Sequence, residues 1–175
     1  MKPCNPADLQ RVRAVILDVD GVLTDGRIGY GAGPDEIKFF DVKDGHGLKL
    51  LLRAGLKAGI LSGRSSSANR RRAEELGLSF VYEGAKNKAE AFATLLREQE
   101  LRAEECLYVG DDLIDLPVMR RCGVAVAVAD AVAEVLEAAS WVTRAHGGRG
   151  AVREVAEWIL KGQNKWNDVT GRYVV

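Results

Sequence analysis

Two aspartates, Asp18 and Asp20, stand where an apolar run ends early in the chain. The run, residues 14–17, predicts a buried strand, and Gly21 allows the chain to turn directly after it. Open α/β sheets bind their ligands at the carboxyl ends of strands. Two carboxylates held close together repel each other unless a cation joins them, so we expect a hard divalent ion such as Mg²⁺ here. One carboxylate then remains to attack a substrate or to transfer a proton.

Further polar groups follow other predicted elements. Ser62 and the pair Asp111 and Asp112 each come at the end of an apolar run, and Lys88 opens a predicted helix. In a parallel sheet the carboxyl ends of the strands lie along one edge, so these groups converge with the first two acids. Together they supply what phosphoryl transfer through an aspartyl-phosphate requires: a carboxylate nucleophile, a metal to offset charge, and donors for the phosphoryl oxygens.

The elements that must position these groups alternate along the chain. Strands that alternate with helices of about 10–15 residues predict a parallel sheet wound on both faces, with right-handed crossovers. Apolar residues flank a Gly/Pro/Asp cluster in residues 27–41, which predicts a projecting β-hairpin. We therefore expect one domain over residues 1–175 with a doubly wound, Rossmann-like α/β fold and no cap domain. The tail, residues 163–175, is polar and then apolar, which is typical of an arm rather than a helix.

Composition narrows the classes of function. The chain has 175 residues, 47% of them hydrophobic, which is enough for a substantial core. Its formal net charge is zero, so nothing indicates a nucleic-acid or anionic-membrane partner. The three cysteines lack metal-ligand spacing and are interpreted as reduced structural thiols. No apolar run approaches the roughly 20 residues of a membrane span, and the first residues lack a signal-peptide core. We expect a soluble, cytoplasmic protein.

The motifs occur in an order known from one enzyme superfamily. Residues 18–24, Ser62, Lys88 and residues 110–115 resemble the four ordered motifs of the haloacid dehalogenase superfamily of phosphatases. The match spans most of the chain, and four motifs in order at strand ends are highly specific. The resemblance implies a Mg²⁺-dependent phosphatase that works through an aspartyl-phosphate.

Carried onto this chain, the resemblance implies catalytic roles for four residues. Asp18 is expected to attack phosphorus in line. Asp20 is expected to protonate the leaving sugar oxygen and then to deprotonate the water that hydrolyses the aspartyl-phosphate. Ser62 and Lys88 are expected to hold the phosphoryl oxygens, and Lys88 also to restrain the two acids.

The metal site implied by the resemblance uses a second set of atoms. Mg²⁺ is expected to bind the carboxylates of Asp18 and Asp111 and the backbone carbonyl of Asp20, with Asp112 helping through water. Asp115 is the other candidate for that outer contact. It is equally well interpreted as a residue that starts or caps a helical turn.

Within the superfamily, the chain resembles the phosphatases of eight-carbon sugar acids. The segments that carry this resemblance are 18–26, 40–45, 61–64, 70–72, 110–115 and 146–154. It implies a phosphorylated sugar acid as substrate and a step in lipopolysaccharide precursor synthesis. An arginine fork recognises a carboxylate well, so we expect Arg64 to bind the substrate. Residues 70–72 are three arginines about 100° apart on a helix, so at most one or two face a site, and we assign Arg72.

The spacing of the motifs leaves no room for a lid domain. Only the hairpin separates Asp18 from Ser62, and 26 positions separate Ser62 from Lys88. An open site would leave the reaction wet and unselective. The resemblance implies a homotetramer in which neighbouring subunits supply the missing walls through the hairpin. The tail over residues 164–175 is interpreted either as a further segment that reaches a neighbour's site or as a disordered terminus.

Other interpretations stay open. Nine-carbon sugar acid 9-phosphate phosphatases share the scaffold. A signalling receiver domain also uses acids, a hydroxyl and a lysine, but it lacks the paired Asp18 and Asp20. A non-catalytic oligomerisation module would not need all of these groups. Residues 147–150, glycine-rich before a helix, indicate either an anion site or a tight turn, and we favour the turn. His46 and His146 are isolated, which indicates surface or loop positions.

Overall fold

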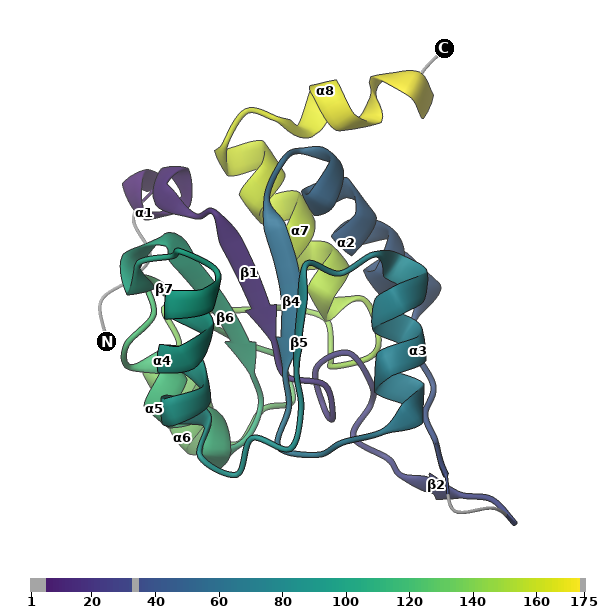
Figure 1. Cartoon of the computed structure of the whole chain (residues 1–175). Helices are drawn as coiled ribbons and strands as arrows, with labels where there is room; N and C mark the ends of the chain where they lie inside the picture. The colour runs from purple at the N-terminus through teal and green to yellow at the C-terminus, as the bar shows by residue number, and fades with distance from the viewer. Residues whose placement is uncertain (1–5, 33–34, 174–175) are drawn as a thin grey trace.

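The computed structural model describes residues 6–32 and 35–173, and a six-stranded sheet forms its centre (Figure 1). The strands are β1 (Ala14–Leu17), β4 (Lys57–Leu61), β5 (Phe80–Tyr82), β6 (Cys106–Gly110), β7 (Val124–Ala127) and β8 (Trp141–Val142). They lie in the order β5-β4-β1-β6-β7-β8, and every neighbouring pair is parallel. The predicted α/β fold is confirmed.

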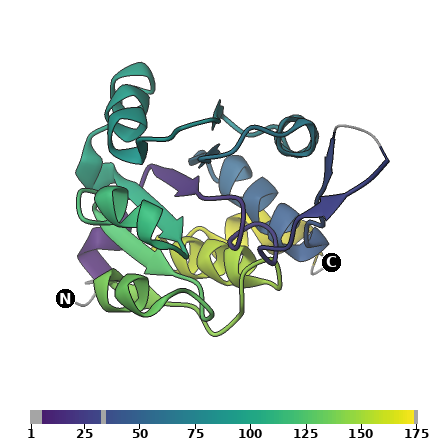
Figure 2. The ribbon, with the colours of Figure 1, turned by 90° about the horizontal axis from the view of Figure 1, so that it is seen from below.

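Helices cover both faces of this sheet (Figures 1 and 2). On one side lie α4 (Lys88–Glu98), α5 (Leu116–Met119) and α6 (Ala133–Ala138), and on the other α2 (Val42–Arg53), α3 (Ser67–Leu76) and α7 (Ala151–Gly162). The short helix α1 (Pro6–Arg11) precedes β1. Every residue of β1 and β6 is buried, as expected for parallel strands covered on both faces.

Local sequence sets where the helices near the strand ends begin. The side chain of Asp41 accepts the backbone N–H groups of Lys43 and Asp44 and so begins α2. Ser66 caps α3 in the same way. Asn87 caps α4, and this cap places Lys88 in the first turn of that helix.

The register of the sheet aligns three strand ends. Leu17, the last residue of β1, lies opposite Ile60 in β4 and opposite Val109 in β6. The backbone N–H of Asp18 then donates to the carbonyl of Val109 at 3.0 Å, which extends the pairing by one residue. The residues that follow these three strands therefore lie side by side at the carboxyl end of the sheet, which faces the viewer in Figure 2.

A small hairpin projects from this edge (Figures 1 and 2). Its strands are β2 (Gly29–Tyr30) and β3 (Glu36–Ile37), which pair antiparallel. The projecting hairpin predicted from the sequence is confirmed, and its two strands lie within the predicted range 27–41. Tyr30 and Phe39 are 80% and 75% exposed, whereas Phe40, at the base of the hairpin, packs against the core of its own chain.

The prediction of an arm rather than a helix at the end of the chain was wrong. Residues Trp166–Thr170 form α8, and a 3₁₀ turn, Gly171–Tyr173, follows. The Arg53 guanidinium holds this segment on α2 by donating to the Val169 carbonyl at 3.0 Å. The short helix forms because Val169 is buried and Trp166 packs against the core. Within the described part of the chain, no helix combines the length and apolarity needed to cross a membrane.

Candidate active site

The nucleophile candidate Asp18 is buried, only 4% exposed, and bonded to a buried lysine. The Lys88 ammonium donates to Asp18 Oδ1 at 2.5 Å, to Asp115 Oδ1 at 2.6 Å and to the Tyr108 hydroxyl at 3.2 Å. Burial alone would lower the pKa of Lys88, but the two carboxylates outweigh it and raise that pKa above its usual value. Lys88 therefore stays charged and fixes the orientation of Asp18.

Asp115 lies behind this pair and is fully buried. Its Oδ1 accepts from Lys88 and from the Tyr108 hydroxyl at 2.6 Å. Its Oδ2 accepts the backbone N–H groups of Asp111 and Asp112 at 2.9 and 3.2 Å. Two of these four hydrogen bonds hold the Lys88 and Tyr108 side chains, and the other two hold the backbone of the loop after β6. Asp115 therefore fixes both the lysine and this loop.

Asp111 carries the clearest sign of a metal site. Its Oδ1 is buried and has no hydrogen-bond partner among the residues that the structure describes, although buried carboxylate oxygens are normally satisfied. Ligand atoms of Asp18, Asp111 and Asp115 lie within 4.8 Å of one another. Because Asp115 already makes four bonds, Asp18 and Asp111 are the carboxylates best placed to hold a cation. Gly21 belongs to the same site, since a Cβ there would overlap the Asp111 carboxylate.

The charges of this cluster are unbalanced without a cation. Burial, followed by repulsion from Asp18 and Asp115, raises the pKa of Asp111 to about 8. Burial also raises the pKa of Asp18 to about 6, with Asp115 adding to the rise and Lys88 opposing it. These shifts mean that the protein alone does not favour both carboxylates in their ionised form at neutral pH. A divalent cation would reverse that preference.

Ser62 directly follows β4, at the predicted strand end, and its side chain is held by a hydrogen bond. The residue is 1% exposed, and its hydroxyl oxygen accepts the backbone N–H of Arg64 at 3.2 Å. The hydroxyl proton is thereby left to donate. Asp112 is exposed by comparison, and its Oδ1 accepts the N–H of Leu113 at 2.7 Å. Asp112 is not among the clustered carboxylates, and its contact with a metal through water stays a prediction.

Asp20 contacts a residue that we did not predict. The Lys38 ammonium, from the hairpin, lies 2.6 Å from Asp20 Oδ1, and its side chain is fully buried. Arg64 Nε lies 3.9 Å from Asp20 Oδ2. Arg64 also bonds Glu36 of β3, so the hairpin and the loop after β4 meet at Asp20.

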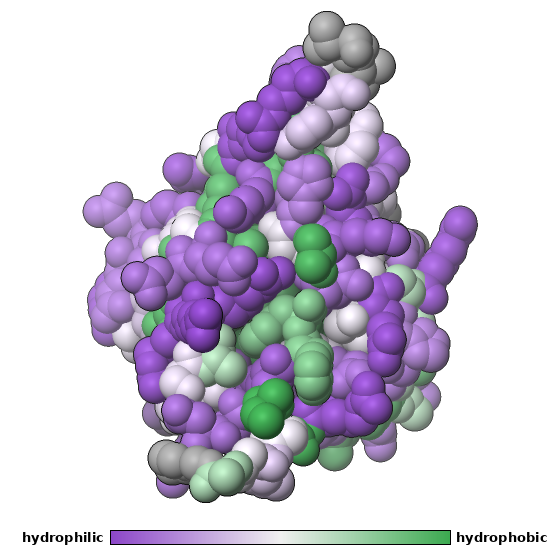
Figure 3. Space-filling view, turned by 90° about the vertical axis from the view of Figure 1, so that its right-hand side faces the viewer, coloured by the Kyte–Doolittle hydropathy of each residue, from purple (hydrophilic) through white to green (hydrophobic). Residues whose placement is uncertain are grey.

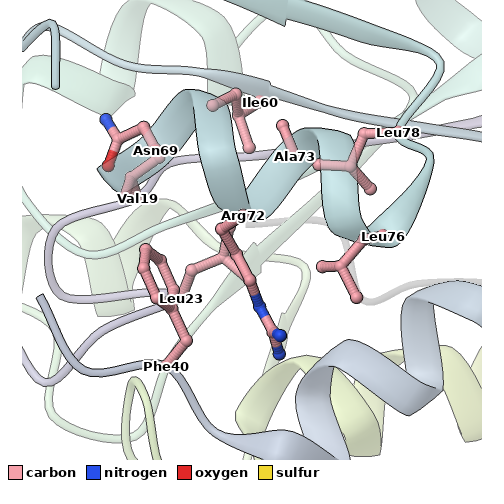
Figure 4. Close-up of a pocket in the computed structure, with 9 residues that line it drawn as sticks. All are labelled: Val19, Leu23, Phe40, Ile60, Asn69, Arg72, Ala73, Leu76 and Leu78. Carbon is pink, nitrogen blue, oxygen red and sulfur yellow. The ribbon is translucent and has the colours of Figure 1, made fainter. Parts of the chain in front are cut away.

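The structure places Arg72 away from the acidic cluster. Figure 4 shows its side chain extending from α3 past Phe40. One guanidinium nitrogen donates to the Asp41 carbonyl at 3.1 Å and another to Glu75 at 3.2 Å. The first contact joins α3 to the start of α2, and the second lies within α3. The structure therefore does not bring Arg72 together with Ser62 and Lys88, and its role in substrate binding stays a prediction.

The glycine-rich loop 147–150 is a tight turn, as favoured from sequence. Its backbone N–H groups all donate within the protein: Gly147 to Asp130, Gly148 to the Val22 carbonyl, Arg149 to the His146 carbonyl and Gly150 to Asp44. No N–H of this loop remains to bind an anion. The loop instead packs on the turn after β1, because Gly147 and Gly148 lie against the backbone of Gly21 and Thr24. His146 is exposed, as expected from its isolation in the sequence.

Known proteins resemble this chain in sequence and in fold. Residues 79–155 match the family of haloacid dehalogenase-like hydrolases. The chain is 43% identical, over 168 residues, to the 3-deoxy-D-manno-octulosonate 8-phosphate phosphatase of Escherichia coli strain K12. That alignment covers 96% of this chain and 89% of the relative.

Solved structures agree with the sequence relatives. The 3-deoxy-D-manno-octulosonate 8-phosphate phosphatase of Yersinia pestis is similar with a TM-score of 0.89 and 42% identity, over 91% of this chain and 86% of that chain. The enzyme of the same name from Moraxella catarrhalis is similar with a TM-score of 0.92 and 36% sequence identity. The match covers 96% of this chain and 97% of that chain. That structure is a complex with a magnesium ion, a phosphate ion and a KDO molecule.

Proposed function

The chain belongs to the haloacid dehalogenase-like hydrolases, in the family of the 3-deoxy-D-manno-octulosonate 8-phosphate phosphatases, and from this membership we propose its reaction. It hydrolyses 3-deoxy-D-manno-octulosonate 8-phosphate to the sugar acid, KDO, and inorganic phosphate. The observation that carries the proposal is the buried Asp18–Lys88–Asp115 cluster beside the unpartnered Asp111 oxygen. It supplies a fixed carboxylate nucleophile next to a place for a cation.

The reaction proceeds in two steps. A carboxylate oxygen of Asp18 attacks phosphorus, and the bond from phosphorus to the sugar oxygen breaks while Asp20 gives that oxygen its proton. Asp20, now ionised, takes a proton from a water molecule whose oxygen attacks the phosphorus of the aspartyl-phosphate. Inorganic phosphate leaves and Asp18 is restored. Ser62 and Lys88 donate to the phosphoryl oxygens as charge develops on them.

Magnesium is the cofactor that fits the donor set. Hard carboxylate and carbonyl oxygens are its preferred ligands, and the relative from Moraxella catarrhalis contains this ion. We assign Asp18 and Asp111 as its carboxylate ligands, with the backbone carbonyl of Asp20. Asp112 would assist through water. When bound, the ion offsets the negative charge of the carboxylates and of the phosphoryl group.

The substrate carboxylate is assigned to Arg64. Its side chain is 46% exposed and lies next to Asp20, so it borders the reacting groups and remains reachable. A guanidinium binds a carboxylate through two parallel hydrogen bonds. Arg64 would have to exchange its present partner, Glu36, for the substrate.

The oligomer we propose is a homotetramer with sites completed by neighbours. The hairpin and α3 border a groove of about 770 Å³, which is lined by residues that include Lys38, Phe39, Ser67, Arg71 and Glu75. On the side of the molecule drawn in Figure 3, apolar surface is exposed among hydrophilic residues. In and next to the hairpin, Ile37, Phe39 and Val42 are exposed apolar residues. A second copy that covers them would also close the open site.

The cellular setting belongs to the same proposal. Release of KDO would serve lipopolysaccharide precursor synthesis, and we place the enzyme in the cytoplasm. The free thiols of Cys106 and Cys122 are compatible with a reducing compartment.

The decisive measurement is phosphate release from 3-deoxy-D-manno-octulosonate 8-phosphate beside the nine-carbon sugar acid 9-phosphates, first with Mg²⁺ and then with EDTA. We expect rapid release from the eight-carbon substrate and its loss in EDTA. Asp18→Asn should abolish release, because an amide cannot form the aspartyl-phosphate. Preference for a nine-carbon substrate would keep the mechanism and change the specificity. No turnover of any phosphate would leave the non-catalytic oligomerisation module as the better interpretation.

A further inference from the structure

The hairpin buries a lysine that the mechanism above does not use. The Lys38 side chain is fully buried, and its ammonium lies 2.6 Å from Asp20 Oδ1. Removing an ammonium from water is costly unless it is paired and hydrogen-bonded. A lysine in a short projecting hairpin would otherwise extend into solvent. Its burial against one particular carboxylate oxygen therefore requires an explanation.

We propose that Lys38 is a positioning residue for Asp20, and that it selects which carboxylate oxygen carries the catalytic proton. This rests on the proposed function, in which Asp20 is the acid and the base. An ammonium has only donors, so a proton on Oδ1 would be placed against the N–H groups of Lys38. The transferable proton therefore resides on Oδ2.

The surroundings of Asp20 support this division between the two oxygens. Oδ2 faces the more distant Arg64, whose Nε lies 3.9 Å away, and the Asp20 side chain keeps 18% of its surface exposed. Because Lys38 occupies Oδ1, Oδ2 is the oxygen that this arrangement leaves for a substrate or a water molecule. Lys38 prevents the carboxyl group from rotating and exchanging its two oxygens.

Glu36 fixes the lysine in turn. Its carboxylate lies 3.8 Å from the Lys38 ammonium and is bonded to Arg64. Glu36 Oε2 is buried and has no hydrogen-bond partner within residues 6–32 and 35–173, so Lys38 is the charge that compensates it. The end of β3 therefore positions the acid–base group, although it lies 18 residues further along the chain.

The test separates proton transfer from phosphoryl binding. Lys38→Met keeps a long side chain but removes the charge, and Lys38→Arg keeps the charge. Lys49→Met replaces an exposed lysine on α2 and serves as the control. Each variant is assayed with Mg²⁺ on the sugar acid phosphate, whose alkoxide needs a proton. It is also assayed on p-nitrophenyl phosphate, whose leaving group departs without one.

We expect Lys38→Met to lower kcat/KM for the sugar acid phosphate roughly 10- to 100-fold, as for a misplaced general acid. The value of kcat/KM for p-nitrophenyl phosphate should change less than about threefold. This parameter reports the first chemical step, in which the nitrophenolate leaves without a proton from Asp20. Lys38→Arg should restore part of the lost activity. In the Asp20→Asn background, Lys38→Met should cause no further loss, since its effect acts through Asp20.

Three outcomes would overturn the proposal. Equal losses on both substrates would indicate a general structural role, and so would losses that add to those of Asp20→Asn. Full activity of Lys38→Met would show that Asp20 needs no positioning by this lysine. Thermal unfolding shows whether Lys38→Met is folded. If it is not, the two substrates are compared with Lys38→Arg, for which we expect a loss of kcat/KM on the sugar acid phosphate and not on p-nitrophenyl phosphate. A wild-type protein inactive on every phosphate would instead contradict the proposed function.

Discussion

At the scale of single residues, Asp115 connects the parts of the active site. It accepts from Lys88, from Tyr108 and from two backbone N–H groups of the loop after β6. The Tyr108 hydroxyl stays protonated because burial raises the pKa of this residue well above its usual value. Asp115 thus acts on catalysis through its neighbours rather than by touching the substrate.

Asp115→Asn should therefore weaken both stability and turnover. The amide offers one acceptor oxygen where four donors now converge, and it leaves part of the charge of Lys88 uncompensated. Loss of one member of a buried ion pair costs about 3 kcal/mol of folding free energy. The melting temperature in thermal unfolding should therefore decrease clearly. We expect kcat to fall at least about tenfold, because Asp18 and Asp111 lose their fixed positions. The control Asp168→Asn, on the exposed side of α8, should change neither.

Metal binding should depend on pH with a predictable sign. The pKa of Asp111 is raised from its usual 3.8 to about 8, so without metal this carboxyl holds a proton at pH 7. Mg²⁺ needs the carboxylate, so its binding must expel that proton. The affinity for Mg²⁺ should rise about tenfold per pH unit between about 6 and about 8 and level off above.

Calorimetry of Mg²⁺ binding in two buffers that differ in ionisation enthalpy measures this release. About one proton per ion is expected at pH 7. Zero protons would contradict the raised pKa. The metal-free protein should also lose stability as pH rises from about 4 to about 8. In that range the folded chain holds a proton on Asp111 that the unfolded chain has already released.

Most catalytic candidates could be predicted from the sequence because each lies at a strand end or a helix start. The apolar runs before Asp18, Ser62 and Asp111 are visible without a structure, and parallel strands bring such ends to one edge. Lys38 could not be found in this way, because an isolated lysine in a hairpin gives no sign of being buried. Arg72 shows the converse limit: helical spacing does not say which neighbour a side chain meets.

At the scale of elements, the loop 147–150 supports the turn that carries Asp20. Gly147 lies so close to the Gly21 carbonyl that a Cβ would overlap it. The loop is held there by carboxylates, since Asp130 accepts the N–H of Gly147 and Asp44 that of Gly150. The elements of the sheet were predictable, but this contact between distant loops depends on how the whole chain folds.

Gly147→Ala should disturb the turn after β1. Overpacking of this kind costs about 1–3 kcal/mol, and the displaced turn should lower kcat as well. Gly171→Ala is a matched control, because a Cβ there meets no described residue within 4 Å and its backbone is helical. We expect the control to be neutral or slightly stabilising. A Gly147→Ala protein with unchanged thermal unfolding and turnover would show that the turn tolerates displacement.

At the scale of the whole molecule, the hairpin is a feature whose apolar side chains a single chain leaves exposed. Phe39 is 75% exposed in a part of the chain that also positions Asp20. The predicted tetramer would bury it.

Phe39→Ser should therefore weaken assembly. We expect light scattering after size-exclusion chromatography to detect species smaller than the tetramer of the unchanged protein. The control Val81→Ser removes another exposed apolar side chain, 40% exposed on β5, and should keep the wild-type mass. A monomeric wild-type protein would refute the proposed assembly directly.

The contact between Gly147 and Gly21 has a consequence for synthesis on the ribosome. Asp18, the nucleophile candidate, precedes by more than 120 residues the loop 147–150 that supports the turn after it. Domains generally fold as units as the chain emerges. A nascent chain that stops before residue 144 lacks this loop and also α7, the helix that packs along α2. The enzyme should thus acquire its activity only after synthesis has passed residue 162, the end of α7.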